Sequence, residues 1–257
     1  MVLEYNQIVK KIKDKRELAG LSDLIVKNVL EDYEKKYKIS LISLKEKELK
    51  LAIKEIRASL RNYTGRFQKN LKLRKAVLKK GSFIDVLKTH SSTAERLDFY
   101  PQLNKIISDL NISSILDLAC GLNPLAIAKK DFKYYASDID ESNLEIVKTF
   151  FQKNNIAGEV FTYDLRRIED NLPKVDLCLL FKVLDIIDDK KHKLSEKILK
   201  VLQCKYLLVS FSTKKLSGKS MDFPQRYWFE KLLTRLNYKY KIIKTKNEVF
   251  FLIEKVN

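Results

Sequence analysis

Three aspartates and a glycine-containing turn follow apolar runs of the sequence, which is where an α/β sheet binds small ligands. The segment Asp117–Pro124 (DLACGLNP) comes directly after one apolar run, and its small residues let the backbone approach a ligand closely. Asp138 ends the next run, where a carboxylate can accept hydrogen bonds from ribose hydroxyls. Asp164 follows a third run, where it can accept one from an adenine amino group. Together these positions predict a nucleoside site.

Each of these residues also has a purely structural interpretation. A plain strand-to-helix turn would use the same small residues as 117–124. Asp140 competes with Asp138 for the ribose, although it more naturally starts the following helix, and Asp164 can equally be a solvent-exposed helix cap. The turn has a single glycine, Gly121, and so lacks the glycines that seat a pyrophosphate on a helix N-terminus. A nucleoside without phosphates therefore fits better than a nicotinamide dinucleotide, and we predict S-adenosylmethionine.

From about residue 110 onward, short apolar runs alternate with helical stretches. This alternation predicts an α/β fold with a parallel Rossmann-like sheet of the class I methyltransferase type and right-handed crossovers. An antiparallel hairpin at the C-terminal end closes one edge of the sheet, because two strand-like runs flank a short turn. The predicted strands are 112–119, 133–138, 160–163, 175–181, 206–211, 239–244 and 249–254, with helices over 142–154 and 190–202.

The first third of the chain is strongly basic and helical. Residues 1–80 hold 22 lysines and arginines against 10 aspartates and glutamates, a net of +12 out of +18 for the whole chain. No proline occurs there, and apolar residues recur at helical spacing, which predicts a small bundle of amphipathic helices. We expect residues 1–82 to form a basic helical RNA-binding region and residues 83–257 to form the methyltransferase domain.

Basic side chains gather toward the end of this region. Lys54, Arg57 and Arg61 fall on one face of a predicted helix, and Arg66 and Lys69 follow closely, ahead of further charges at 72, 74 and 75. A solvated helix face would carry the same charges. Their clustering favours contact with phosphates, so we predict RNA as the partner, with a membrane surface as a weaker competitor.

Several classes of protein and site are excluded by composition. The chain has three cysteines without a CxxC pair and two histidines, so neither a disulfide framework nor a metal centre is expected. It shows no apolar signal core and no apolar run of membrane-spanning length. We therefore expect a cytoplasmic protein without membrane contact, and a monomer, because its target surface is large.

Five segments of the second region together resemble one known family. They are His90–Arg96 (HSSTAER), Asp117–Pro124, Leu179–Leu184 (LLFKVL), Ser210–Lys219 (SFSTKKLSGK) and Tyr227–Glu230 (YWFE). In order and spacing they resemble the aminoglycoside-resistance 16S rRNA (guanine-N7) methyltransferases, the group that contains ArmA and RmtB. The resemblance runs from about residue 85 to the end, while the N-terminal region matches in length and character only.

The resemblance implies a role for each matching position. S-adenosyl-L-methionine would be the cofactor, with Arg96, beside Ser92 and Thr93, holding its methionine carboxylate as a guanidinium can. The implied cofactor site also includes His90, Ala119, Gly121, Asn123, Asp138, Ile139, Asp164 and Leu165. The implied target pocket comprises Lys182, Ser210, Phe211 and Lys214, and the implied RNA contacts add Lys215 and Lys219 to the N-terminal ones.

Two departures from the family pattern concern the cofactor turn and the target loop. Ala119 stands where the family usually has glycine, which adds a methyl group near the cofactor, and Ser212 replaces a proline, which frees the loop backbone. The expected function is methylation of guanine N7 in 16S rRNA of the assembled small subunit, with aminoglycoside resistance as a potential result. Another RNA position, or RNA binding without catalysis, remains open, and no acid–base residue is required.

Overall fold

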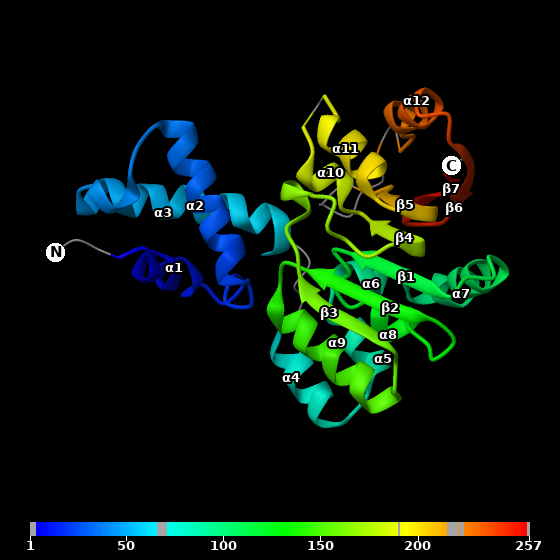
Figure 1. Cartoon of the computed structure of the whole chain (residues 1–257). Helices are drawn as coiled ribbons and strands as arrows, with labels where there is room; N and C mark the ends of the chain where they lie inside the picture. The colour runs from blue at the N-terminus through cyan, green and yellow to red at the C-terminus, as the bar shows by residue number, and fades with distance from the viewer. Residues whose placement is uncertain (1–3, 66–70, 190, 215–220, 222–223, 256–257) are drawn as a thin grey trace.

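The computed structural model describes residues 4–65, 71–189, 191–214, 221 and 224–255. Its centre is a seven-stranded sheet of order β3-β2-β1-β4-β5-β7-β6 (Figure 1). The first five strands are parallel, and β7 and β6 complete the sheet as an antiparallel hairpin, so the predicted α/β fold is confirmed. The strands are β1 (Ser114–Leu118), β2 (Lys133–Asp138), β3 (Gly158–Thr162), β4 (Val175–Phe181), β5 (Cys204–Ser212), β6 (Lys239–Lys244) and β7 (Glu248–Glu254).

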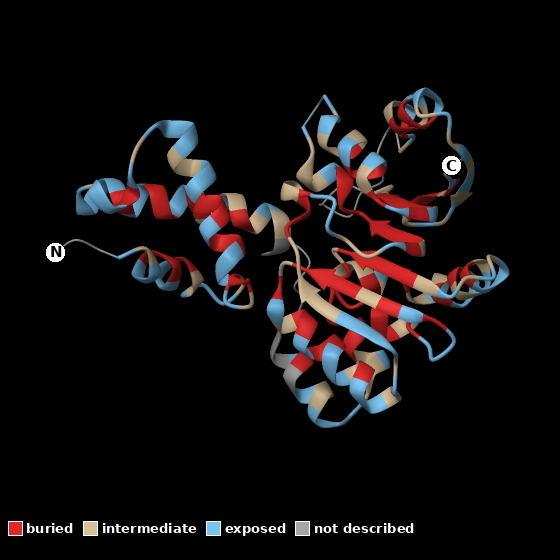
Figure 2. Cartoon of the chain, in the orientation of Figure 1, coloured by how far each residue is buried: buried red, intermediate tan, exposed pale blue. Residues whose placement is uncertain are grey.

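Helices cover both faces of this sheet, so its central strands are buried (Figure 2). Because both faces are buried, these strands carry apolar side chains on both sides. One hydrophobic core lies between the sheet and α4 (Leu71–Lys79), α5 (Phe83–Leu87), α7 (Tyr100–Asp109), α8 (Pro124–Ile127) and α9 (Glu141–Asn154). The other lies beneath α10 (Leu184–Ile187), α11 (Lys193–Val201) and α12 (Tyr227–Arg235). The short helix α6 (Ser91–Arg96) and the 3₁₀ turns η3 (Leu97–Phe99) and η4 (Leu165–Arg167) connect these layers to the strand ends.

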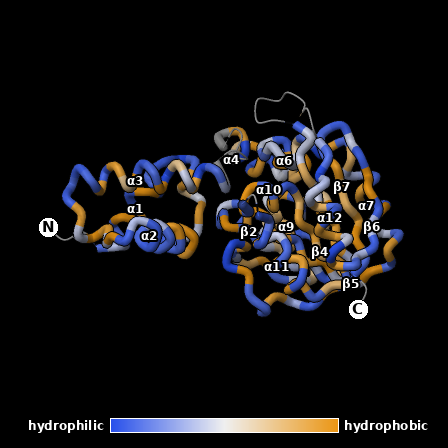
Figure 3. Tube along the Cα trace, turned by 90° about the horizontal axis from the view of Figure 1, so that it is seen from above, coloured by the Kyte–Doolittle hydropathy of each residue, from blue (hydrophilic) through white to orange (hydrophobic). Residues whose placement is uncertain are grey.

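The N-terminal helices form a separate lobe with its own core (Figure 3). It contains α1 (Tyr5–Lys13), α2 (Asp23–Tyr37), the 3₁₀ turn η1 (Leu41–Ser43) and α3 (Glu46–Leu60), followed by the π-helical turn η2 (Arg61–Gly65). Their apolar faces meet as the helical spacing predicts, burying Ile12, Leu30 and Ile56 among others. We call α1–α3 the N-terminal bundle.

Helix α4 does not pack with that bundle. Arg74 of α4 is buried against the sheet domain, where its guanidinium donates to Thr89 Oγ1 at 2.8 Å and to Asn143 Oδ1 at 2.9 Å. The N-terminal hydrophobic core includes residues up to Leu60, whereas α4 contacts the sheet-domain core through Val77 and Leu78. Arg74 is therefore an internal tie rather than the phosphate contact that its position in the charge cluster predicted.

Candidate functional site

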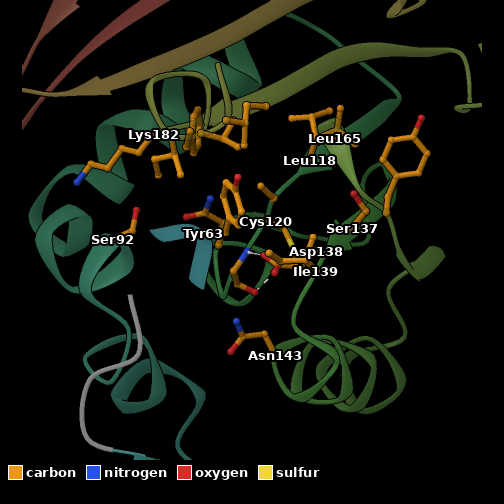
Figure 4. Close-up of a pocket in the computed structure, with 18 of the residues that line it drawn as sticks. Tyr63, Ser92, Leu118, Cys120, Ser137, Asp138, Ile139, Asn143, Leu165 and Lys182 are labelled. Atoms are coloured by element: carbon orange, nitrogen blue, oxygen red, sulfur yellow. Dashed lines mark hydrogen bonds between the residues drawn. The ribbon is translucent and has the colours of Figure 1, made fainter. Parts of the chain in front are cut away.

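A cavity of about 850 Å³, counting the part that opens to solvent, lies at the carboxyl edge of the parallel strands. Parallel sheets bind ligands at this edge. Lys182 and Ser92 lie on one side of it, Asp138 and Ile139 on the other, and Tyr63 lies between them (Figure 4). The predicted site residues that line it are His90, Ser92, Thr93, Ala119, Gly121, Asn123, Asp138, Ile139, Asp164, Leu165 and Lys182.

Asp138 stands at the end of β2 with its carboxylate facing this cavity. Its two oxygens accept the backbone N–H of Gly121 at 2.7 Å and of Asp140 at 2.9 Å. Each oxygen has a second lone pair, so the group can still accept from a ligand. Burial, reinforced by the charge of Asp140, raises the pKa of Asp138 to about 6. Asp140 itself caps α9 through the N–H groups of Ser142 and Asn143, as expected from its position.

The turn after β1 brings the backbone close to the cavity. Ala119 and Gly121 both have positive φ values, +56° and +53°. A Cβ on Gly121 would lie 2.9 Å from the His90 ring, so glycine is required there for both conformation and space. The left-handed conformation at position 119 explains why glycine suits that position and why alanine carries strain.

Asp117, at the start of the same segment, lies outside the cavity. Its carboxylate is fully buried and accepts the Tyr134 hydroxyl at 2.8 Å. Burial raises the pKa of Asp117 to about 7. This residue therefore belongs to the sheet interior beneath the turn.

Asp164 follows β3 and closes the far side of the cavity. Its oxygens accept from Arg166 Nε at 2.8 Å and Nη2 at 2.7 Å, and from Asn28 Nδ2 at 3.1 Å. It also caps η4 through the backbone N–H of Arg166, but it is buried and not a solvent-exposed cap. Although burial opposes ionisation, the hydrogen bonds and charge of Arg166 hold the pKa of Asp164 below its ordinary value.

Arg96 occupies a different place from the one expected. Its guanidinium is 1% exposed, does not line the cavity, and pairs with Glu248 through Nε at 3.0 Å and Nη2 at 2.8 Å. It also donates to Asn123 Oδ1 at 2.5 Å and Ser92 Oγ at 3.3 Å. These bonds use four of its five N–H donors. In this structure Glu248 supplies the carboxylate that Arg96 pairs with, so the role of Arg96 toward a cofactor carboxylate stays a prediction.

Lys182 lines the cavity directly after β4, with a positive φ of +56°. Its ammonium contacts Glu95 at 2.7 Å and Glu248 at 3.3 Å. Although burial opposes ionisation, the charges of Arg96 and Lys182 hold the pKa of Glu248 below its ordinary value. Two cations and two carboxylates thus form one balanced cluster beside the cavity, which we call the Glu248 network: Arg96, Lys182, Glu95 and Glu248.

The remaining predicted target-pocket residues do not reach the cavity. Ser210 is buried beneath it, where its hydroxyl donates to Glu248 at 2.7 Å. Phe211 is 0% exposed and packs on Trp228 and Phe229 in the core under α12, so its ring does not face the cavity in this structure. Lys214 is half-buried outside the cavity lining. The predicted RNA contacts Lys215 and Lys219, like Arg66 and Lys69, lie outside the described residues.

RNA contacts were predicted at Lys54 and Arg57 of α3 and at Arg61, the first residue of η2. Lys54 is exposed. Arg57 instead donates to the backbone carbonyls of Lys11 and Ile12, and Arg61 pairs with Glu17 at 2.8 Å. These two arginines tie α3 and η2 to α1 and the loop after it. Their spacing on one helix face could not distinguish this role from phosphate binding.

Three residues important to the site escaped sequence reasoning. Glu248 is a lone carboxylate at the start of an apolar strand, a pattern that signals a buried partner. Tyr63 and Arg166 reach the cavity from η2 and η4, and the Arg166 guanidinium lies over the Tyr63 ring at 4.5 Å. Nothing in their local sequence indicates this contact, because the two segments are far apart in the chain.

Over the ranges that the structure describes, no group of three or more His, Cys, Asp or Glu side chains could hold a metal ion. In the same ranges, no helix has the length and apolarity that crossing a membrane requires.

Comparisons with known proteins bear on the identity of this site. Residues 50–252 match the family described as "Ribosomal RNA methyltransferase (FmrO)". The chain is 28% identical over 180 residues to the 16S rRNA (guanine(1405)-N(7))-methyltransferase of Micromonospora echinospora, covering 66% of this chain and 64% of that relative. It is 28% identical over 194 residues to the Serratia marcescens protein of the same name, covering 72% and 76%. The match thus spans less than two thirds of the Micromonospora protein.

Two solved structures share the fold over nearly the whole chain. The 16S rRNA methyltransferase RmtF in complex with S-adenosyl-L-homocysteine aligns with a TM-score of 0.81 and 22% identity, covering 99% of this chain and 100% of that one. The 16S rRNA methylase RmtB aligns with a TM-score of 0.77 and 23% identity, covering 98% and 99%. With the family match over residues 50–252, the conclusion is that the chain belongs to the ribosomal RNA methyltransferase (FmrO) family.

Proposed function

We propose that this protein transfers the methyl group of S-adenosylmethionine to N7 of a guanine in 16S rRNA. The observation that carries the proposal is the convergence of Asp138, Asp164 and the Gly121 turn on one cavity at the carboxyl edge of the sheet. Family membership and the activities of the two relatives support it.

The lining of the cavity fits an adenosyl ligand. Asp138 retains acceptor capacity for ribose hydroxyls, and Ile139 and Leu165 offer apolar surfaces for the adenine between them. Both oxygens of Asp164 already accept two hydrogen bonds each, from Arg166 and Asn28, so a bond from the adenine amino group would replace one of these. No helix N-terminus with a glycine-rich loop is present among the described residues at this edge, which agrees with a ligand lacking phosphates.

The methionine end would be held by Asn123 and Ser92. The Asn123 Oδ1 accepts from Arg96 at 2.5 Å and from the Tyr100 hydroxyl at 2.7 Å. That orientation leaves its Nδ2 as the donor for a carboxylate in the cavity. Arg96 then acts through Asn123 as a positioning residue.

Methyl transfer to guanine N7 requires the protein mainly to align the reacting atoms. When bound, S-adenosylmethionine supplies an electrophilic methyl group, and guanine N7 has a lone pair and no proton to remove. No general base is therefore needed. The cavity walls align the reacting atoms and exclude water, while the Glu248 network keeps Lys182 at the mouth.

The substrate would be folded rRNA in an assembled small subunit. N7 lies in the deep groove of an RNA helix, so the guanine must be turned out to reach the cavity. The basic N-terminal region would hold the surrounding phosphates, with Lys54 as one exposed contact. We propose that the protein acts as a monomer on ribosomes in the cytoplasm, and that aminoglycoside resistance would result if the modified guanine lies in the drug site.

Incubation of small subunits with labelled S-adenosylmethionine, followed by mapping of the modified nucleotide, tests this proposal. The expected product is N7-methylguanine in 16S rRNA. A methyl group elsewhere would instead support the same fold acting on another RNA position. If calorimetry detects no cofactor binding and no label is transferred, the protein is an RNA-binding relative without activity.

A further inference from the structure

The N-terminal region contributes a wall to the cofactor cavity. Tyr63 of η2 lines the cavity together with Asp138 and Asp164, although η2 directly continues α3 of the N-terminal bundle. The ring of Tyr63 lies under the Arg166 guanidinium at 4.5 Å. Arg166 in turn makes a two-point contact with Asp164. Arg166 thus joins Tyr63, from the turn that continues the bundle, to Asp164, the residue proposed to face the adenine.

A second connection runs through helix α2. Asn28 is buried, and its Nδ2 donates to Asp164 Oδ2 at 3.1 Å. Its backbone carbonyl accepts Arg167 Nη2 at 3.1 Å, and Arg167 also pairs with Glu31 at 3.1 Å and Asp32 at 3.0 Å. The 3₁₀ turn that carries Arg166 and Arg167 is therefore held by α2.

A third connection reaches the loop after β2. The N–H of Ser22 donates to the Ile139 carbonyl at 3.1 Å, and the N–H of Glu141 donates to the Gly20 carbonyl at 2.8 Å. A Cβ on Gly20 would approach Asp140 Oδ1 to 2.5 Å, so the close approach requires glycine. The side chain of Ile139 packs against the bundle core.

We propose that the N-terminal bundle is an integral half of the cofactor site and couples cofactor binding to RNA docking. Tyr63 packs against the bound nucleoside, while Asn28 and Ser22 fix the two loops that carry Asp164 and Asp138. This inference rests on the proposed function, because it takes the cavity as the cofactor site. The same bundle is proposed to bind RNA. If bound cofactor changes the affinity for RNA by some factor, bound RNA therefore changes the affinity for the cofactor by the same factor.

Calorimetry of the full chain with S-adenosylhomocysteine, without RNA, tests whether Tyr63 forms part of the cofactor site. We expect Tyr63→Ala to weaken binding about tenfold, because stacking on one aromatic ring contributes on that order. Tyr63→Phe should retain most of the affinity, since the ring remains. Asn28→Ala should weaken binding about threefold through a less well-held Asp164. Tyr37→Ala is the matched control: it removes a tyrosine of α2 that is 47% exposed and does not line the cavity.

Hydrogen exchange tests whether cofactor binding affects the bundle, and it does not rely on the folding of any variant. In the wild-type chain, S-adenosylhomocysteine should slow exchange of the Ser22 amide and of the first turns of α2. This inference would be overturned if wild type and Tyr63→Ala bind S-adenosylhomocysteine equally well, or if the ligand leaves amide exchange in the bundle unchanged. Either result would leave the proposed function standing. Failure of the wild-type chain to bind at all would overturn both.

Discussion

The two sides of the cavity include ion pairs of different exposure, although the Asp164–Arg166 pair on the adenosine side is also largely buried, with side chains 6% and 16% exposed. On the adenosine side, Arg167 is 37% exposed and its partners Glu31 and Asp32 are 50% and 55% exposed. On the other side, Arg96 and Glu248 are 1% and 2% exposed. Exposed ion pairs contribute about 0–1 kcal/mol, whereas removing one partner of a buried pair costs about 3–5 kcal/mol.

On the proposed function, the side beside Lys182 would receive the target base, and alignment of reacting atoms tolerates little movement. The adenosine side would admit the cofactor and release the product, and its contacts come from a bundle that has a core of its own. The cavity is thus bounded on one side by the C-terminal hairpin and on the other by contacts from the N-terminal bundle.

The largest effect should follow removal of Glu248. Glu248→Ala leaves Arg96 and Lys182 without their shared carboxylate, so we expect the free energy of unfolding to fall by about 3–5 kcal/mol. Urea denaturation followed by circular dichroism measures this loss. Glu254→Ala, on the exposed end of the same strand, is the control and should change stability little. A loss below about 1 kcal/mol would show that this pair does not fix the hairpin side of the cavity.

Acid should weaken cofactor binding through Asp138. Its pKa of about 6 means that it is ionised at pH 7.5 and protonated at pH 5, where it no longer accepts from both ribose hydroxyls as a carboxylate. We expect the dissociation constant for S-adenosylhomocysteine to rise about tenfold over that range.

Two substitutions isolate the source of this pH dependence. Asp138→Asn should bind weakly with a flat pH profile. Asp164→Asn should keep the slope, because the pKa of Asp164 lies below its ordinary value and that group stays ionised. A slope that persists in Asp138→Asn would assign the titration to another residue.

A smaller effect should separate structural from RNA-facing charges on α3. Replacing Arg57 and Arg61 together by alanine should lower bundle stability by about 1 kcal/mol, because both tie α3 to neighbouring segments. Lys54→Ala should leave stability unchanged and reduce the salt slope of binding to small subunits by about 1. Melting curves and binding over a salt series measure the two effects. An unaltered salt slope in Lys54→Ala would show that Lys54 belongs to a solvated helix face and does not contact RNA phosphates.

The smallest expected effect concerns the turn after β1. Ala119→Gly removes a left-handed alanine and adds unfolded-state entropy, so we expect a net stabilisation of about 0.5 kcal/mol. Thermal melting of the ligand-free protein measures it. A destabilised variant would mean that the alanine methyl makes packing contacts worth more than the strain.

Regular elements were predictable because their patterns are local. Strands β2, β4 and β6 begin and end where the apolar runs predicted. Strand β5 extends beyond its predicted bounds at both ends, since pairing with β4 and β7 continues there. The packing of α4 against the sheet domain was missed, because Arg74 has the same local signature whether it meets phosphate or is buried against Thr89.

The sequence also predicted correctly that residues at the strand ends lie near the cavity. Asp138, Gly121 and Lys182 line it because parallel strands bring their carboxyl ends to one edge. Arg96 and Phe211 lie outside the cavity lining, because their environments depend on Glu248 and on helix α12. Pairings over such separations leave no periodic trace in the sequence.

By itself, the sequence determined the alternation of strands and helices, the antiparallel edge, the basic N-terminal region and the carboxylates at the strand ends. These follow from hydrophobic period and residue type, which act over a few neighbours. Only the tertiary structure decided which charges face inward, because burial depends on what packs above a residue. It placed Glu248 against Arg96 and Tyr63 against Arg166, and so divided the cavity between the two ends of the chain.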